Sequence, residues 1–190
     1  MRAAGTTCPE QNDTAGYWEP ALIGPDGQVI RADGSSAYYS SDASIAGRTQ
    51  PYPADLRIVA GGVNAGPAVT FWACKGEGVK YLAPPKCTAG IPRAIVHFPQ
   101  CWDGKNLDSP DHRSHVAYPR AGACPSTHPV KIPHLKLYVR FALTVGGAGY
   151  KFSDGTTLPH ADFWNTWNQP ALEALVRDCL NAGVDCGKQQ

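Results

Sequence analysis

The sequence predicts a mainly β fold: a single-domain β-sandwich of the jelly-roll type over residues 1–190, with long disulfide-tied loops and one C-terminal helix. Two observations lead to this prediction. Twenty glycines and 17 prolines divide the 190 residues into short segments, which favours strands and turns over long helices. Hydrophobic residues make up 43% of the chain, so it has enough apolar side chains to form a core.

Seven segments are predicted to be strands because they are rich in β-branched or aromatic residues and end at glycine or proline. The first two flank the turn Gly24-Pro-Asp-Gly27 and are expected to form a hairpin. In the last, apolar residues from Leu135 to Phe141 alternate with polar ones, so one face should be buried. The segments are 17–23, 28–30, 37–40, 56–60, 68–74, 94–98 and 135–145.

One segment, residues 170–180, has the spacing of apolar residues that is typical of a helix. Pro170 stands near its start, where a helix tolerates proline, and Gly183 follows its end. The sequence therefore predicts one helix, at the C-terminus.

Seven cysteines and a single methionine favour an oxidising compartment, and we interpret the chain as secreted or extracellular. Three pairs of cysteines flank short turns or loops and are expected to form local disulfides. They are Cys74 with Cys87, Cys101 with Cys124, and Cys179 with Cys186. Cys8 is left without a partner.

Charge and hydropathy exclude two classes of partner. Charged residues are 17% of the chain and the formal net charge is +1, so there is no basic field to attract nucleic acid. No apolar run approaches the roughly 20 residues of a membrane span. The partner is instead expected to be a polysaccharide or a cell-wall glycan.

Side chains capable of chemistry are concentrated in the segment from Cys101 to His128. This stretch contains glycines and prolines that exclude a long helix, which indicates a loop site. The candidate catalytic residues are Asp103, Asp108, Asp111, His112 and His115. The candidate substrate-binding residues are Trp102, Asn106, Arg113, Tyr118, His128 and Trp164.

Several motifs occur in the order found in one family of secreted fungal and actinobacterial proteins. They are Tyr17-Trp-Glu-Pro-Ala-Leu22, Leu56-Arg-Ile-Val-Ala-Gly61, Phe98-Pro-Gln-Cys-Trp-Asp-Gly-Lys-Asn-Leu-Asp-Ser-Pro-Asp-His112, His115-Val-Ala-Tyr118-Pro and Cys124-Pro-Ser-Thr-His-Pro-Val130. The chain resembles this family, known as the domain of unknown function nineteen ninety-six, over nearly its whole length. The resemblance implies export but no established activity. It also implies that the chain is truncated at its N-terminus, so that Cys8 has lost its partner.

The candidate residues suggest cleavage of a polysaccharide. A glycoside hydrolase needs a proton donor and a second carboxylate, which two of Asp103, Asp108, Asp111 and Asp162 could supply. A polysaccharide lyase needs a base such as His112, His115 or Tyr118, and a cation such as Arg113 or Lys105 beside a uronic carboxylate. Trp102, Tyr118, Trp164 and Trp167 could stack on sugar rings, although tryptophans more often fill a core.

A divalent metal ion is the alternative use of these side chains. Zinc or copper would take histidines and a carboxylate from His112, His115, His128, His160 and Asp162. Asp103, Asn106 and Asp108 have the oxygen ligands that calcium prefers, but not the spacing of an EF-hand.

Two function classes stay open. The first is a carbohydrate-active enzyme, in which these groups surround one cleft. The second is a non-catalytic module that binds a polysaccharide or a metal, in which an aromatic face is open and the polar groups are tied into loop hydrogen bonds. Aspartates in such turns commonly satisfy local backbone donors and nothing else.

Overall fold

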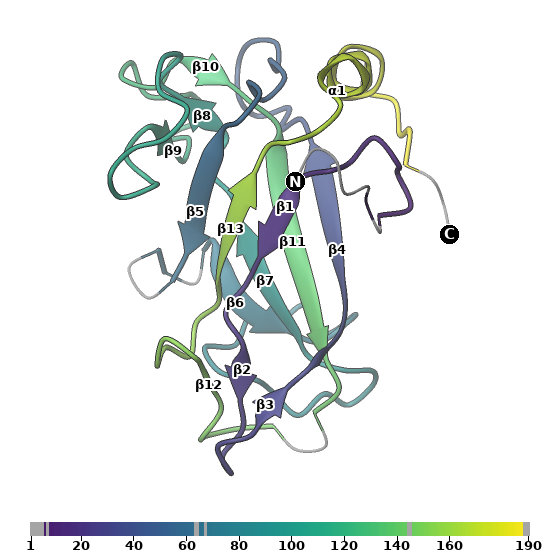
Figure 1. Ribbon diagram of the computed structural model, residues 1–190, viewed down its shortest axis with the longest axis vertical. Coiled ribbons are helices and arrows are strands. Elements are labelled where there is room, and N and C mark those ends of the chain that lie inside the picture. The colour runs from purple at the N-terminus through teal and green to yellow at the C-terminus, as the bar shows by residue number, and fades with distance from the viewer. Residues whose placement is uncertain (1–5, 7, 63–64, 67, 144–145, 188–190) are drawn as a thin grey trace.

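The computed structural model describes residues 6, 8–62, 65–66, 68–143 and 146–187. Within these residues the chain forms 13 strands in four antiparallel sheets, followed by one helical segment (Figure 1). The predicted mainly β class is therefore confirmed. Residues 144–145, the end of the longest predicted strand, lie outside the described residues.

The two sheets that enclose the core are called here the front sheet and the back sheet. The front sheet has the order β1-β13-β5 and consists of β1 (Gly16–Trp18), β13 (His160–Trp164) and β5 (Arg57–Gly61). The back sheet has the order β4-β11-β7-β6 and consists of β4 (Ala32–Ser40), β11 (His134–Phe141), β7 (Arg93–His97) and β6 (Thr70–Ala73).

The core lies between these two sheets because each turns one apolar face inward. On β11 every second residue, from Leu135 to Phe141, is buried, as the alternation predicted. Phe163 of β13 faces this layer from the front sheet and contacts the rings of Tyr52 and Phe98. Alternation has a second consequence: the intervening residues of both sheets point outward, away from the core.

Two small sheets extend the sandwich at its ends (Figure 1). One has the order β12-β2-β3 and consists of β12 (Lys151–Phe152), β2 (Leu22–Ile23) and β3 (Val29–Ile30). The other has the order β10-β8-β9 and consists of β10 (Val130–Lys131), β8 (Cys101–Trp102) and β9 (Val116–Ala117). The second small sheet holds the segment in which the site residues were predicted.

The predicted hairpin at the start of the chain is only half correct. Residues 22–23 pair with 29–30 as expected, but residues 16–18 leave the hairpin and pair with β13. The strand is interrupted at Pro20, which has no N–H to donate to a ladder. Trp18 thereby becomes part of the front sheet.

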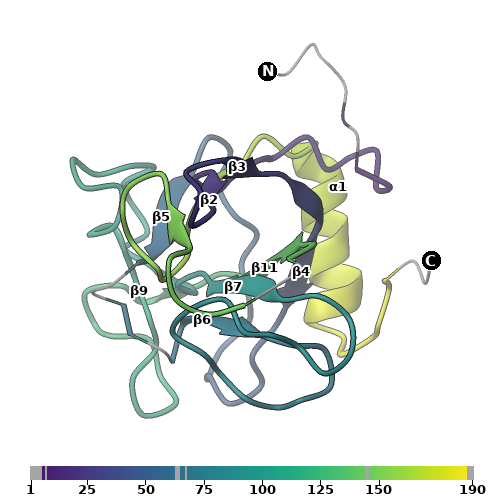
Figure 2. The ribbon, with the colours of Figure 1, turned by 90° about the horizontal axis from the view of Figure 1, so that it is seen from below.

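The C-terminal helix packs beside β4 at one side of the sandwich (Figure 2). It begins as α1 (Gln169–Leu175), where the Asn168 side chain accepts a hydrogen bond from the Ala171 N–H. It continues as one π-helical stretch, η1 (Val176–Leu180), so the predicted helix is confirmed. None of the described helices is long and apolar enough to cross a lipid bilayer.

All three predicted disulfides are present. Cys74 pairs with Cys87, Cys101 with Cys124, and Cys179 with Cys186. Cys8 is a free cysteine. The bridge from Cys101 to Cys124 closes the base of the predicted site segment.

Candidate functional site

The loop from residue 103 to 115, called here the site loop, lies along the outer edge of the front sheet. The backbone N–H of Arg57 donates to the carbonyl oxygen of Leu107 at 2.9 Å, and that of Val59 to the carbonyl oxygen of His112 at 2.9 Å. Because β5 is the edge strand, its outward N–H groups need partners, and the site loop supplies them. These bonds bring His112 onto the outer face of the front sheet.

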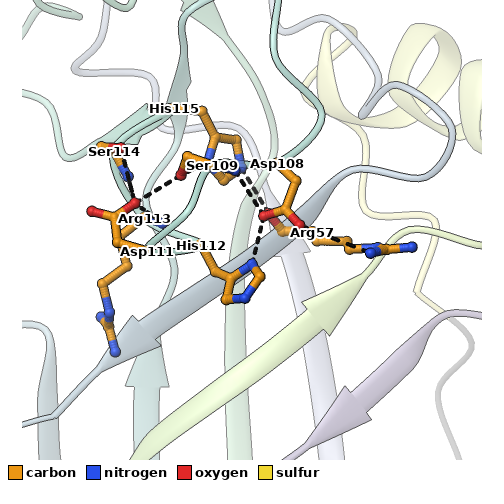
Figure 3. A network of polar contacts seen from close by, with 8 residues as sticks. All are labelled: Arg57, Asp108, Ser109, Asp111, His112, Arg113, Ser114 and His115. Atoms are coloured by element: carbon orange, nitrogen blue, oxygen red, sulfur yellow. Dashed lines mark hydrogen bonds and ion pairs between the residues drawn. The ribbon is translucent and has the colours of Figure 1, made fainter.

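Asp108 and His112 form a close pair at this edge (Figure 3). The Nδ1 atom of His112 lies 2.6 Å from Oδ1 of Asp108, which also accepts the backbone N–H of Ser109 at 2.8 Å. The guanidinium of Arg57 is 3.8 Å from the other carboxylate oxygen. His112 has a positive φ of 53°, a conformation that costs energy in a residue with a side chain. The contact with Asp108 and the hydrogen bond from the Val59 N–H to the His112 carbonyl offset this cost and hold His112 at the edge of the sheet.

The pKa of Asp108 is lowered. Partial burial opposes ionisation of this carboxyl, but the hydrogen bond with His112 and the Ser109 N–H outweigh it. Asp108 is therefore an anion that orients the imidazole, and it leaves the Nε2 edge of His112 for a ligand.

Asp111 and His115 are tied into the site loop. Oδ1 of Asp111 accepts the hydroxyls of Ser109 and Ser114 and two backbone N–H groups, and these bonds hold its pKa well below the usual range. His115 is 2% exposed. Its Nε2 donates to the carbonyl oxygen of Arg57 at 2.7 Å, and its Nδ1 contacts Ser109 Oγ at 2.8 Å. Both residues shape the loop, and neither lines the cleft described below.

Asp103, Asn106 and Trp102 belong to a neighbouring turn. Asp103 accepts the backbone N–H groups of Lys105 and Asn106 and the Asn106 side chain, while the Trp102 ring donates to the carbonyl oxygen of Asn106 at 2.7 Å. Burial raises the pKa of Asp103, but these bonds outweigh it and the net effect lowers that pKa. Asp103 therefore stabilises a turn, which is the structural role that the sequence allowed as the alternative to a catalytic one.

A cleft of about 520 Å³ opens on the outer face of the front sheet. Its floor is formed by all three strands, and His112 reaches it from the site loop. Trp18 is 53% exposed at one side, and the guanidinium carbon of Arg57 stands 4.8 Å from the centre of the Trp164 ring at the other. The lining residues are Gly16, Tyr17, Trp18, Arg57, Ile58, Val59, His112, Asp162, Phe163 and Trp164.

Asp162 is the carboxyl group at the centre of this cleft. It lies between Trp18 and Val59 in the register of the sheet. Its Oδ1 atom is buried and has no hydrogen-bond partner among the described residues. Desolvation raises the pKa of Asp162, although nearby His160, Arg113 and His112 oppose the rise. A carboxyl group in this environment keeps its proton to a higher pH than usual and is suited to donate it.

The other predicted binding residues surround the cleft or lie outside it. Arg113 donates to the carbonyl oxygen of Gly61 at 3.1 Å. The Tyr118 hydroxyl donates to the carbonyl oxygen of His97 at 2.8 Å, and burial raises the pKa of Tyr118 to about 12. His128 contacts Thr127 Oγ1 and the carbonyl oxygen of Ser114. Tyr118 and His128 line a separate cavity of about 460 Å³.

The candidate metal ligands do not converge in the part of the chain that the structure describes. The one group there whose ligand atoms lie together is Cys74, Glu77 and Cys87, and its two cysteines form a disulfide. His160 instead contacts Asp154 at 3.2 Å and packs against the ring of Trp18. Among the predicted ligands, His112 and Asp162 share the cleft, whereas His115 and His128 are bonded to loop groups.

The comparison with protein families gives one match. The model of the family described as Domain of unknown function (DUF1996) matches residues 1–167. The chain belongs to this family. No curated protein and no solved structure matches it. The DUF1996 match includes every residue of the cleft and ends just before α1.

Sequence reasoning missed Arg57 and Trp18 as site residues, and it missed the strand that carries Asp162. In β13 the pattern His160, Asp162, Trp164 outward with Ala161 and Phe163 inward is a clear alternation that could have been found. No local signal could place Arg57 beside His112, because that contact depends on how the site loop packs on β5.

Proposed function

We propose that this DUF1996 protein is an extracellular carbohydrate-active enzyme that cleaves a polysaccharide bound in the front cleft. One observation carries the proposal: an unpaired, half-buried carboxyl, Asp162, shares a cleft with an imidazole, His112, that Asp108 orients. The exposed ring of Trp18 offers an apolar surface of the kind that packs on sugars. The three disulfides agree with an oxidising, extracellular setting.

The chemistry that these groups fit best is β-elimination from a uronic acid unit. The Nε2 atom of His112 takes the proton beside the sugar carboxylate, and the Arg57 guanidinium neutralises the charge that builds up there. The electron pair forms a carbon–carbon double bond as the bond to the glycosidic oxygen breaks. Asp162 donates its proton to that leaving oxygen. The products are a new chain end with a hydroxyl and an unsaturated sugar.

Hydrolysis fits the cleft less well. It needs a second carboxylate to activate water or to attack the sugar. Asp108 is the nearest such group in the network, and its Oδ1 is bonded to His112 and to the Ser109 N–H while its Oδ2 faces Arg57. Asp162 thus stands without a free carboxylate partner in the cleft lining.

The test is cleavage of a panel of acidic and neutral polysaccharides, followed as reducing ends and as absorbance of unsaturated products. Asp162→Asn and His112→Gln should each lower the rate about 10²-fold or more. Asp26→Asn, in the turn after β2, and His134→Gln, on β11 of the back sheet, are matched controls and should keep full activity. If reducing ends form without that absorbance, the reaction is hydrolysis and not elimination. If the control variants lose as much activity as the two cleft variants, the front cleft is not the active site.

A non-catalytic binding module is the second candidate. It is favoured by the hydrogen bonds that tie Asp103, Asp111 and His115 into the loop, as expected if these groups only shape a binding surface. Trp18 would then be a binding residue alone. Retention on a polysaccharide that is lost in Trp18→Ala, with no product from any substrate, would establish this candidate instead of the enzyme.

A further inference from the structure

The outer face of the back sheet, called here the back face, carries a set of cations and aromatic rings far from the front cleft. On β11 the side chains of Leu135, Leu137, Val139 and Phe141 are buried, and the side chains of the residues between them point outward. Neighbouring strands add residues in register with them. The back face is defined by Tyr38, Arg93, His97, Lys136, Tyr138 and Arg140.

Two arginines on this face are direct cross-strand partners. Arg140 of β11 stands opposite Arg93 of β7 in the register. Like charges in this position destabilise a sheet. No ion pair relieves Arg93, Lys136 or Arg140 within the described part of the chain, and the Nε atom of Arg93 is buried without a hydrogen-bond partner there. The Nη1 atom of Arg140 donates to Ser36 Oγ of β4 at 3.1 Å, so its guanidinium lies on the β4 side of β11 while Arg93 lies on the β7 side. Anionic groups bound along this face would balance these positive charges.

The positive charge extends along β11 from Arg140 to Lys136. Lys136 lies between Tyr38 and His97 in the register. Burial, aided by the charges of His134 and Lys136, lowers the pKa of His97 to about 4, so at neutral pH the charge of this face comes from the lysine and the two arginines. His134 adjoins this face, and Asp42 is the one acidic side chain among the described residues whose charge shifts the pKa of His134. The face therefore complements a polyanion.

The aromatic rings give the face a platform for sugars. Tyr38 is 57% exposed, and its ring meets the edge of the Tyr138 ring at 5.3 Å between centroids. Each tyrosine braces the other, which leaves a fixed apolar surface beside the cations. From residue 134 to residue 140 the strand extends about 20 Å, which is enough for several sugar units.

We propose that the back face is a second binding surface, separate from the front cleft, for a strand of acidic polysaccharide. Arg93, Lys136 and Arg140 pair with its carboxylates, and Tyr38 with Tyr138 packs on its sugar rings. The choice of a polysaccharide over another polyanion rests on the proposed function. The positive charge of the back face is independent of that function, so binding at this face is tested without any measurement of cleavage.

The experiment measures binding of the full chain to polygalacturonate by affinity electrophoresis and calorimetry at low and moderate salt. Fully methyl-esterified polygalacturonate is the uncharged match. The double variant Lys136→Gln/Arg140→Gln should weaken binding about tenfold or more. The double variant Arg48→Gln/Lys151→Gln removes the same net charge from exposed positions outside the back face and should bind as the unmodified chain does. Tyr38→Ala should weaken binding at both salt concentrations, because ring packing is not screened.

Three outcomes would overturn the proposal. They are equal weakening in the two double variants, equal binding of the esterified polymer, and tighter binding of single-stranded DNA than of polygalacturonate at the same site. His112→Gln separates this proposal from the function of the cleft, since it should lower the cleavage rate about 10²-fold or more and leave binding at the back face intact. Thermal unfolding of each variant checks that it is folded.

Discussion

At the scale of single residues, Glu19 is an acid placed where its charge is unfavourable. Both carboxyl oxygens are buried and have no hydrogen-bond partner among the described residues. Burial raises the pKa of Glu19 from 4.5 to about 8. Between these values the folded chain holds a proton that the unfolded chain has lost, so the free energy of unfolding falls as the pH rises from about 4.5 to 8.

Replacing Glu19 by glutamine should remove this part of the pH dependence. Glu19→Gln changes the free energy of unfolding at each pH. We expect this change to be more stabilising at pH 8 than at pH 4.5, by a few kcal/mol. Urea unfolding at a series of pH values measures this difference. Glu173→Gln, at an exposed position on α1, is the control. If both variants follow the pH curve of the unmodified chain, Glu19 is not the group responsible.

At the scale of elements, the site depends on how the loop is held to the edge of β5. The Cys101–Cys124 bridge closes 23 residues around the site loop. Removing it should lower stability by about 3 kcal/mol, chiefly by freeing the unfolded chain. It should also loosen the bonds from the N–H groups of Arg57 and Val59 to the loop carbonyls.

Hydrogen exchange measures this loosening. In Cys101→Ser/Cys124→Ser we expect the amides of Arg57 and Val59 to exchange about tenfold faster or more. Cys74→Ser/Cys87→Ser removes a bridge that closes a shorter loop, of 13 residues, at another position, and it should lower the melting temperature without affecting those two amides. Unchanged exchange in the first variant would mean that the loop is held by its side-chain network alone.

The length and the periodicity of the strands explain how much of the fold could be predicted from the sequence. The strands with continuous or alternating apolar residues and the one amphipathic helix were predicted, because burial of one face leaves a periodic pattern. Five strands were not predicted: β8, β9, β10, β12 and β13. Four of them have two residues each, too few for a period to appear. Residues 32–36 were missed as the start of β4 because they are Ala-Asp-Gly-Ser-Ser, whose pairing with β11 is set by the partner strand.

The candidate site was predicted in its loop but not in its floor. Asp108 and His112 lie four residues apart, and their contact could be expected from the sequence. The cleft also needs Trp18, Arg57 and Asp162 from three strands that are distant in the chain. Their proximity follows from the order β1-β13-β5. Strand order is a property of long-range packing, and no local pattern encodes it.

At the scale of the whole molecule, the front sheet and the back sheet lie on opposite sides of the core (Figures 1 and 2). The front cleft and the back face are on their outer sides and are therefore separated by the core. A short oligosaccharide can occupy only one of them at a time. If both proposals hold, a long acidic polymer binds the back face with one stretch and enters the cleft with another, which raises its local concentration at the cleft.

This separation predicts a dependence on substrate length. For long polygalacturonate, Lys136→Gln/Arg140→Gln should raise KM about tenfold with kcat unchanged, because these two side chains lie on the opposite surface from the reacting bond. For oligomers too short to leave the cleft, the same variant should have the kinetics of the unmodified chain. His112→Gln should instead lower kcat for both lengths. A rise in KM for the oligomers as large as for the polymer would place Lys136 and Arg140 in the same site as His112, which contradicts the two-surface arrangement.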